Sequence, residues 1–183
     1  AYYASFKHQN SDLRYLETMA WHFGAAPSMA RPRKVAVFSD CVYEVNGVAL
    51  GLRRILGEAR ASGCPMVLMT SSDRPSGVED GILNFPAVAR FPMPHYPEMT
   101  LSIPPLLEML DRCEREEITT IQVSTPGPVG LAGLLIAHLL DLPAVGFYHT
   151  NLPDLIRDVT GDASLDGLVR ACTAWLYRQM DAV

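Results

Sequence analysis

Three short stretches hold residue types whose spacing could do chemistry. Asn46-Gly47 stands where a loop gives way to helical spacing, residues 124–130 read STPGPVG, and His149 stands among hydroxyl side chains after a short apolar run. A helix that begins at Gly47 would offer unpaired N–H groups and the positive end of its dipole to an anion such as a phosphate. Such a set suits a phosphorylated or sugar-bearing ligand better than hydride chemistry. A first turn that binds nothing would explain the Asn46-Gly47 stretch equally well.

The elements that would position these stretches alternate between strands and helices. Short apolar runs predict five strands, at residues 35–39, 66–70, 82–85, 118–123 and 143–147. Helical spacing predicts helices from Gly47, at about 102–117 and at 130–140. This alternation predicts an α/β fold, a Rossmann-like doubly wound parallel sheet with helices on both faces and right-handed crossovers.

The order of the strands would decide where a ligand binds. If the order is the common 3-2-1-4-5, the winding of the sheet reverses between the first and the fourth strand. Ligands of such folds bind outside the carboxyl ends of the strands at that switch point. Three predicted loops meet that description, at residues 40–47, 124–130 and 148–151. Their convergence is better evidence for a site than any one of them.

The connecting stretches are less regular. Residues 71–81 are predicted to be polar turn material, and the proline-rich stretch 86–99 should be extended and partly rigid. Its His95 and Tyr96 are candidates for ligand contact, although a wrapping loop without function is equally consistent. Residues 157–180 are predicted to form a polar turn followed by an amphipathic helix.

Residues 1–32 are predicted to be an accessory arm that precedes the domain at 33–183. The spacing predicts a helix over 11–23, which Gly24 ends. Residues 1–34 hold five Lys and Arg against two Asp and Glu, whereas the remainder holds ten against eighteen. A basic arm could touch an anionic membrane surface, although dispersed charges also simply keep a segment in solution.

Composition places the chain among globular proteins of about one domain. Its 183 residues are 49% hydrophobic and 19% charged. A net charge of −5 argues against nucleic-acid binding, which requires a basic face. No stretch reaches the roughly 18 apolar residues of a membrane span. The first residues lack the pattern of a signal peptide and lack a Met, so we expect a processed or excised chain.

Other familiar chemistries lack their residues. The four cysteines form no CxxC or Cys/His cluster, so reduced thiols in a cytoplasmic protein are expected rather than a metal site. Cys41 has no legible His or Asn partner that would make it a nucleophile. The chain has no GxGxxG and no GxxxxGK[ST], and Ser124 lies in no GxSxG. His138, within the apolar run 130–140, is expected to be a packing residue.

Three segments carry a resemblance to a known family: VAVFSDCVYEVNGVALGLRRI, FPMPHYPEMTLSIP and VSTPGPVGLAGLLIAHLLDLPAVGFYHTNLP. Over residues 33–183 the chain resembles the N-terminal half of a retaining glycosyltransferase of family 4, in the GT-B superfamily. Enzymes of that superfamily have two Rossmann-like domains that face each other across a cleft. The resemblance implies that this half mainly binds the acceptor and that a C-terminal half mainly binds the nucleotide-sugar donor.

The resemblance also implies roles for individual residues. Asn46, Gly47 and Val48 would approach the donor diphosphate, and His149 would be catalytic, stabilising charge on the transferred sugar as the glycosidic bond breaks. The residues that would line the cleft or contact the acceptor are Thr125, Pro126, Gly127, Tyr148 and Thr150, with Tyr43, Tyr96 and Asn151 as weaker candidates. No metal ion or other cofactor is expected. The donor would be a GDP- or UDP-linked sugar, and the acceptor a lipid or a saccharide.

The chain departs from the family pattern at its end. Residues 181–183 stand where the family's sequence would run into its second domain, so the paired glutamates and the basic residues of the donor site have no counterpart. We therefore expect an excised N-terminal domain, inactive alone, of a cytoplasmic enzyme that could work at the inner face of the membrane. A stand-alone flavodoxin-like binding module and a GT-B sugar-nucleotide epimerase are the alternatives.

Overall fold

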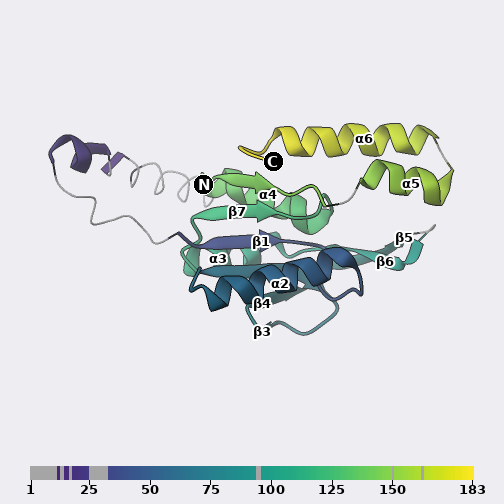
Figure 1. The fold of residues 1–183 in the computed structure, drawn as a ribbon, viewed down its shortest axis with the longest axis horizontal. Coiled ribbons are helices and arrows are strands. Elements are labelled where there is room, and N and C mark those ends of the chain that lie inside the picture. Colours follow the sequence, from purple (N-terminus) through teal and green to yellow (C-terminus); the bar gives the residue numbers. More distant parts are fainter. Residues whose placement is uncertain are drawn as a thin grey trace.

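A computed structural model describes residues 33–93, 96–149, 151–161 and 163–183, together with 12, 15, 16 and 18–24. Its centre is a six-stranded sheet in the order β3-β4-β2-β1-β7-β8 (Figure 1). The five predicted strands are present as β1 (Val35–Phe38), β2 (Met66–Ser72), β4 (Ile82–Pro86), β7 (Thr120–Val123) and β8 (Ala144–Gly146). They are parallel to their neighbours and lie in the predicted order 3-2-1-4-5.

Strand β1 is the centre of the sheet and of the core. All four of its residues are buried, and Val35 is in register with Met66 on one side and with Thr120 on the other. A strand covered on both faces needs apolar side chains in both directions, which explains the unbroken run in the sequence. Apolar residues alternating along β1 therefore belong to two different packing layers.

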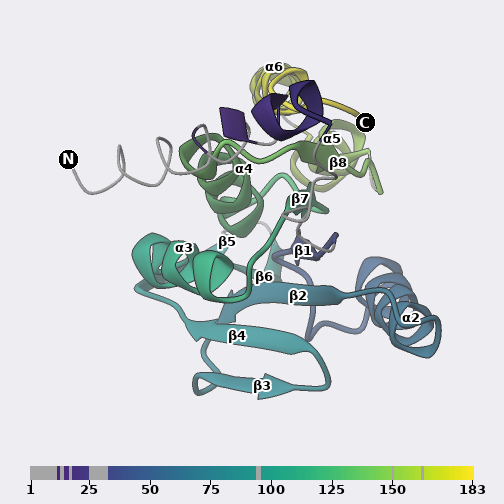
Figure 2. The same ribbon diagram turned by 90° about the vertical axis from the view of Figure 1, so that its left-hand side faces the viewer.

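Helices cover both faces of the sheet (Figure 2). Helix α2 (Gly47–Ala61) packs Leu52 and Leu56 against Val37 on one face. On the other face, α3 (Leu106–Arg115) and α4 (Pro128–Leu140) pack against Phe38 and its neighbours. Gly133 lets α4 lie close to β1, because a Cβ at that position would stand 2.6 Å from the Phe38 ring. Helices α5 (Leu152–Thr160) and α6 (Ala163–Arg178) follow β8.

The predicted polar turn at 71–81 is wrong in part, because it contains a strand. β3 (Gly77–Glu79) pairs antiparallel with β4 at the edge of the sheet. The two strands are joined at Asp80-Gly81, and both residues have positive φ, 48° and 71°. An Asp-Gly pair is a strong signal for a tight hairpin turn, so the sequence did carry this information.

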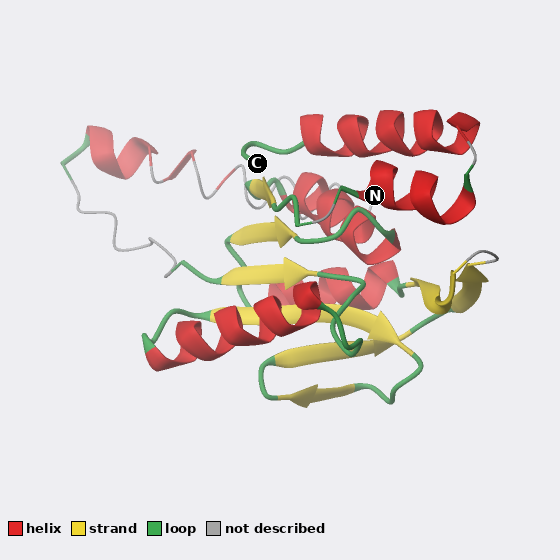
Figure 3. Ribbon diagram, turned by 45° about the vertical axis from the view of Figure 1, so that its right-hand side comes forward, coloured by secondary structure: helices red, strands yellow, loops and turns green. Residues whose placement is uncertain are grey.

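The proline-rich stretch is extended, as predicted, but it also forms a second sheet. β5 (Ala89–Met93) pairs antiparallel with β6 (Tyr96–Ile103), beyond the ends to which the parallel strands point (Figure 3). The predicted helix start at residue 102 is therefore wrong. Two prolines, Pro104 and Pro105, separate β6 from α3, because proline cannot occupy a helix interior without losing a hydrogen bond.

Three other sequence predictions concern the ends of the chain. The predicted polar turn from residue 157 is wrong, since α5 already runs to Thr160 and ends at Gly161 with φ 67°. In the predicted helix 11–23, residues 12, 15, 16 and 18–22 are helical, and the rest of that prediction falls mostly outside the described residues. The division between an arm and a domain at residue 33 stays a prediction. Within the described parts of the chain, no helix has both the length and the apolarity to cross a membrane.

Candidate functional site

The three predicted loops lie at the carboxyl ends of adjacent strands and are joined to one another. Residues 39–46 follow β1, residues 124–127 follow β7, and residues 147–151 follow β8. Hydrogen bonds connect the first loop to the second through Asp40 and Thr125, and the second to the third through Ser124 and His149. The convergence predicted at the switch point is therefore present.

Asp40 occupies the N-terminus of helix α4. Its Oδ1 accepts a hydrogen bond from the Val129 N–H at 2.9 Å, and its Oδ2 accepts from the Gly130 N–H at 3.4 Å. The Thr125 hydroxyl donates to Oδ2 at 2.7 Å and accepts from the Asp40 N–H at 2.8 Å. The helix itself has no side-chain cap, because its N-cap residue is Gly127. A carboxylate from the chain thus fills the anion position of this helix.

Burial and hydrogen bonding act on Asp40 in opposite directions. Burial raises the pKa of its carboxyl above the ordinary value of 3.8, while the bonds from Thr125, Val129 and Gly130 lower it. The effect of burial is the larger, so the pKa is raised. Sequence reasoning missed this residue, since its partners lie 85 or more positions away.

The glycines of STPGPVG are required by this close packing. A Cβ at Gly127 would stand 2.5 Å from Asp40 Oδ2, and a Cβ at Gly130 would stand 1.8 Å from the Thr125 carbonyl oxygen. Pro128 opens the helix, where a missing N–H costs nothing. Thr125, Pro126 and Gly127 are half-buried, so the predicted cleft residues form a tight, partly open turn.

His149 is held by two neighbours. Its Nε2 lies 3.2 Å from the Ser124 hydroxyl, which is itself buried. Its ring stacks on Phe147, with centroids 5.6 Å apart and planes at 22°. The ring is otherwise exposed, so it is oriented yet open to a ligand. Ser124, rejected as a hydrolase nucleophile from its sequence context, is the residue that orients the histidine.

Tyr148 and Asn151 are brought together beside His149. The Tyr148 hydroxyl donates to Asn151 Oδ1 at 3.0 Å, and the Asn151 amide donates to the Asp154 carboxylate. The Tyr148 ring also meets Tyr177 of α6 edge-on, with centroids 5.5 Å apart. These contacts fix the loop to the helices that follow it. Thr150, predicted with them, lies outside the described residues.

The start of α2, the predicted anion site, is capped by the residue that precedes the helix, unlike α4, which Asp40 caps from a distant loop. Asn46 Oδ1 accepts from the Ala49 N–H at 2.8 Å, and its amide donates to Glu44 at 2.7 Å. Asn46 is thus the N-cap residue of the helix. The N–H groups of Gly47 and Val48 belong to the first turn, where no intrahelical acceptor exists. A Cβ at Gly47 would meet nothing within 4 Å, so this end of the helix is open.

Of the two other tyrosines predicted for the acceptor side, the structure describes the side chain of Tyr43 and not that of Tyr96. Tyr43 lies in the first loop, but its ring is covered by the Arg74 guanidinium at 4.0 Å and lines a separate hollow. Tyr96 is in β6, and its side chain lies outside the described residues, as does His95. His138 is exposed on α4 rather than packed, although its Nδ1 lies 3.0 Å from the Leu134 carbonyl.

The cysteine in the first loop is unsuited to nucleophilic chemistry. Burial and the nearby Glu44 raise the pKa of the Cys41 thiol to about 12, so it stays protonated at neutral pH. Among the residues that the structure describes, no three His, Cys, Asp or Glu side chains are grouped so as to hold a metal ion.

The fold and this site define a doubly wound α/β domain with a candidate ligand site at its switch point. A family model described as Glycosyltransferase Family 4 matches residues 45–183. The chain belongs to glycosyltransferase family 4, and its mostly parallel sheet is that of a Rossmann-like half of the GT-B fold.

Three curated proteins are similar to the chain. Sulfoquinovosyl transferase SQD2 of Arabidopsis thaliana is 27% identical over 138 residues, which is 73% of this chain and 26% of that protein. Alpha-monoglucosyldiacylglycerol synthase of Streptococcus pneumoniae is 25% identical over 127 residues, covering 68% and 28%. GDP-mannose-dependent alpha-mannosyltransferase of Mycobacterium tuberculosis is 27% identical over 167 residues, covering 84% and 41%. The chain spans between about a quarter and two fifths of the length of these relatives.

Proposed function

We propose that the chain is the acceptor-side domain of a retaining glycosyltransferase, which moves a sugar from a GDP- or UDP-linked donor to a lipid or saccharide acceptor. Membership of the family supports glycosyl transfer in general. The kinds of donor and acceptor in this proposal are supported by the names of the relatives, since one is GDP-mannose-dependent and another makes a glucosyldiacylglycerol. A second, donor-binding domain of the same protein would complete the site, and the chain alone would be inactive.

The observation that carries the proposal is the Ser124–His149 pair at the carboxyl ends of β7 and β8. The hydrogen bond to Ser124 uses one ring nitrogen and sets the ring plane, which leaves the other edge for the transferred sugar. There His149 would donate or accept a hydrogen bond and stabilise the charge that develops as the glycosidic bond breaks. Asp40 and Thr125 hold the intervening turn and so help to position this pair.

The start of α2 is proposed to face the donor diphosphate. The N–H groups of Gly47 and Val48 and the positive end of the helix dipole would stabilise the charge of the leaving diphosphate. The proposal assigns this stabilisation to the protein rather than to a metal ion or cofactor. The remaining cleft residues, Thr125, Pro126 and Gly127, would border the acceptor, and the enzyme would work in the cytoplasm at the inner membrane face.

Transfer by the longer protein tests this proposal. The chain alone, and a longer protein that joins it to the proposed donor domain, are each incubated with GDP- and UDP-sugars and a cell-envelope extract. Release of nucleoside diphosphate and the mass gained by acceptors are measured. We expect transfer by the longer protein and none by the chain. A folded longer protein that transfers nothing would indicate a binding module instead, and isomerisation of the donor without an acceptor would indicate an epimerase.

A further inference from the structure

A second hollow opens at the same end of the sheet, on the side of β3 and β4. It has a volume of about 310 Å³ and is lined by Tyr43, Arg74, Pro75, Gly77, Glu79 and Asn84; we call it the Arg74 pocket. Tyr43 comes from the loop after β1 and Arg74 from the loop after β2, so the pocket borders the loop that holds Asn46. Its volume is at the small end of ligand pockets and suits a single sugar ring or a headgroup.

The shape of the Arg74 pocket is fixed by a buried amide. Asn84, 5% exposed, accepts a hydrogen bond from the Ser72 hydroxyl at 2.8 Å and donates to the carbonyls of Arg74 and Pro75 at 2.7 and 3.1 Å. The Arg74 N–H in turn donates to the Ser72 hydroxyl at 3.1 Å. The side-chain amide of Asn84 is therefore used to hold the wall of the pocket. Three hydrogen bonds fix the backbone of the loop that carries Arg74.

The charged side chains that line the pocket are Arg74 and Glu79. The guanidinium carbon of Arg74 lies over the Tyr43 ring, 4.0 Å from its centroid, and a guanidinium on a ring face can still donate from its N–H groups to an acceptor. The positive charge of Arg53 and the negative charge of Glu79 also act on the Tyr43 hydroxyl. The adjacent carboxylates are already paired, Asp73 with Arg90 at 2.9 Å and Asp80 with Arg60 at 3.5 Å.

Within the described residues, no ion pair engages Arg74 itself, although carboxylates surround it on the chain. The backbone of Arg74 is held by Ser72 and Asn84, its guanidinium lies over the Tyr43 ring, and it has no carboxylate partner in the described parts of the chain. A guanidinium in this state matches the planar geometry of a carboxylate or phosphate. Glu79, which also lines the pocket, can accept hydrogen bonds from hydroxyl groups but would repel a second anion. Arg74 and Glu79 together favour a ligand that carries one oxyanion and several hydroxyls.

We propose that the Arg74 pocket binds the acceptor through an oxyanion, a carboxylate or phosphate on a hydroxylated ring or glycerol unit, and so selects anionic acceptors. The inference rests on the proposed function. It predicts that Arg74 pairs with the oxyanion while Tyr43 and Glu79 contact the hydroxyls. The oxyanion can belong to a lipid headgroup or to a soluble saccharide, and the chemistry of recognition is the same for both.

Matched sugars test the pocket directly. Methyl α-glucuronide and methyl α-glucoside differ in one carboxylate, as glucose 6-phosphate and glucose differ in one phosphate. Binding of each to the isotope-labelled chain is followed by NMR. We expect each charged sugar to bind at least about tenfold more tightly than its neutral partner, with signals of the Arg74 pocket shifting. Equal binding within both pairs, or no shift with any of the four sugars, would overturn the proposal.

Variants assign the preference to the pocket. Arg74→Gln should abolish the preference for the charged sugar, whereas Arg54→Gln removes an exposed charge from α2 and should retain it. Circular dichroism and thermal unfolding verify that both variants fold. A preference that survives Arg74→Gln, or that Arg54→Gln abolishes equally, would mean that charge acts non-specifically and would contradict the proposal.

Vesicles separate the two sources of the oxyanion. If binding to phosphatidylglycerol vesicles, relative to phosphatidylcholine vesicles, also depends on Arg74, the acceptor is a lipid headgroup; if only the soluble sugars depend on it, the acceptor is a saccharide. The outcomes distinguish a failure of the pocket proposal from a failure of the proposed function. If the chain selects charged sugars but the longer protein transfers nothing, the pocket proposal stands and the proposed function is contradicted. If the longer protein transfers sugar at equal rates to charged and neutral acceptors, the proposed function stands and the pocket proposal is contradicted.

Discussion

The Thr125 hydroxyl donates a hydrogen bond of 2.7 Å to the Asp40 carboxylate, which lies 85 residues earlier in the sequence. The same carboxylate caps α4 through the Val129 N–H. One half-buried side chain thus joins the loop after β1 to the turn that precedes α4, and this turn begins at Ser124, the partner of His149. The site is therefore built by links between loops as well as by the ends of the strands.

The pH dependence of stability tests the state of Asp40. Burial raises its pKa above 3.8, so the folded chain holds the proton more tightly than the unfolded chain does. The stability contributed by this group is then fully present below pH 3.8 and is lost as the pH rises through the folded pKa. Asn keeps the shape and neutral charge of the protonated acid. Relative to Asp40→Asn, the native chain should lose stability as the pH rises, measured by urea unfolding at a series of pH values. If the native chain instead becomes more stable relative to Asp40→Asn as the pH rises, the fold stabilises the ionised carboxylate and the prediction is wrong.

Close packing predicts opposite effects for two glycine substitutions. Gly130→Ala places a Cβ 1.8 Å from the Thr125 carbonyl oxygen, so the backbone must move. We expect a loss of about 3 kcal/mol in the free energy of unfolding. Gly57→Ala, in the open interior of α2, meets nothing within 4 Å and should be neutral or stabilising by up to about 1 kcal/mol. Urea denaturation of both variants measures this difference, and equal effects would show that the turn is less tightly packed than described.

The Ser124 hydroxyl is predicted to orient His149 in catalysis. Ser124→Ala removes the 3.2 Å contact and should lower kcat of the longer protein about tenfold, the value of one hydrogen bond, with little change in KM for the donor. Ser124→Thr can restore the hydroxyl and should recover part of the rate. If Ser124→Ala changes only stability and leaves kcat unaltered, the contact has no positioning role.

Thiol reactivity is predicted to divide the four cysteines into two pairs. Burial raises the pKa of both Cys41 and Cys113 to about 12, whereas Cys64 and Cys172 are exposed. Iodoacetamide at neutral pH should therefore label Cys64 and Cys172 first, as mapped by mass spectrometry of digests. Early labelling of Cys41 would show that the first loop opens, and it would contradict the prediction that the Cys41 thiol is unreactive.

The sequence was sufficient for the five parallel strands and insufficient for the contacts that build the site. The positions of the parallel strands follow from apolar runs such as Val35–Phe38, whose burial on both faces is visible as an unbroken pattern. Their order was taken as the common order of such folds, and the sheet has that order. The β3–β4 hairpin was signalled by Asp80-Gly81 and the start of α3 by Pro104-Pro105, so those errors were avoidable.

The role of Asp40 could not be read in the same way. A capping carboxylate normally stands next to its helix, but this one stands 89 residues before Val129 and replaces the side chain that Gly127 lacks. The Arg74–Tyr43 stack is likewise a contact between two loops that only the sheet order brings together. His149 was predicted from its type and place, whereas its partner Ser124 was predicted only as the first residue of the loop 124–130 and not as a contact of His149.

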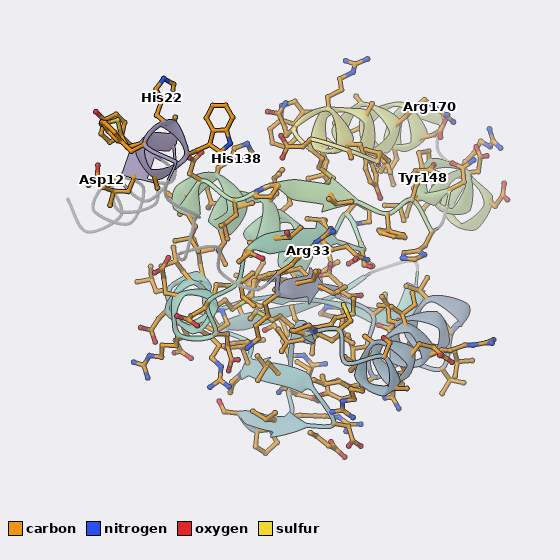
Figure 4. The ribbon with its side chains drawn as sticks, turned by 60° about the vertical axis from the view of Figure 1, so that its left-hand side comes forward. Asp12, His22, Arg33, His138, Tyr148 and Arg170 are labelled. Carbon is orange, nitrogen blue, oxygen red and sulfur yellow. The ribbon has the colours of Figure 1, made fainter. Side chains whose placement is uncertain are left out.

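The central claim is that His149 acts on the transferred sugar at the acceptor side of a glycosyltransferase. The most direct test compares kcat of the longer protein with that of two histidine variants. His138 is a matched control, because it is exposed on α4 and lies apart from Tyr148 (Figure 4). We predict that His149→Ala lowers kcat by about 10²–10³-fold, while His138→Ala stays within about twofold of the native rate. Equal rates for the two variants, with both folded, would contradict the claim.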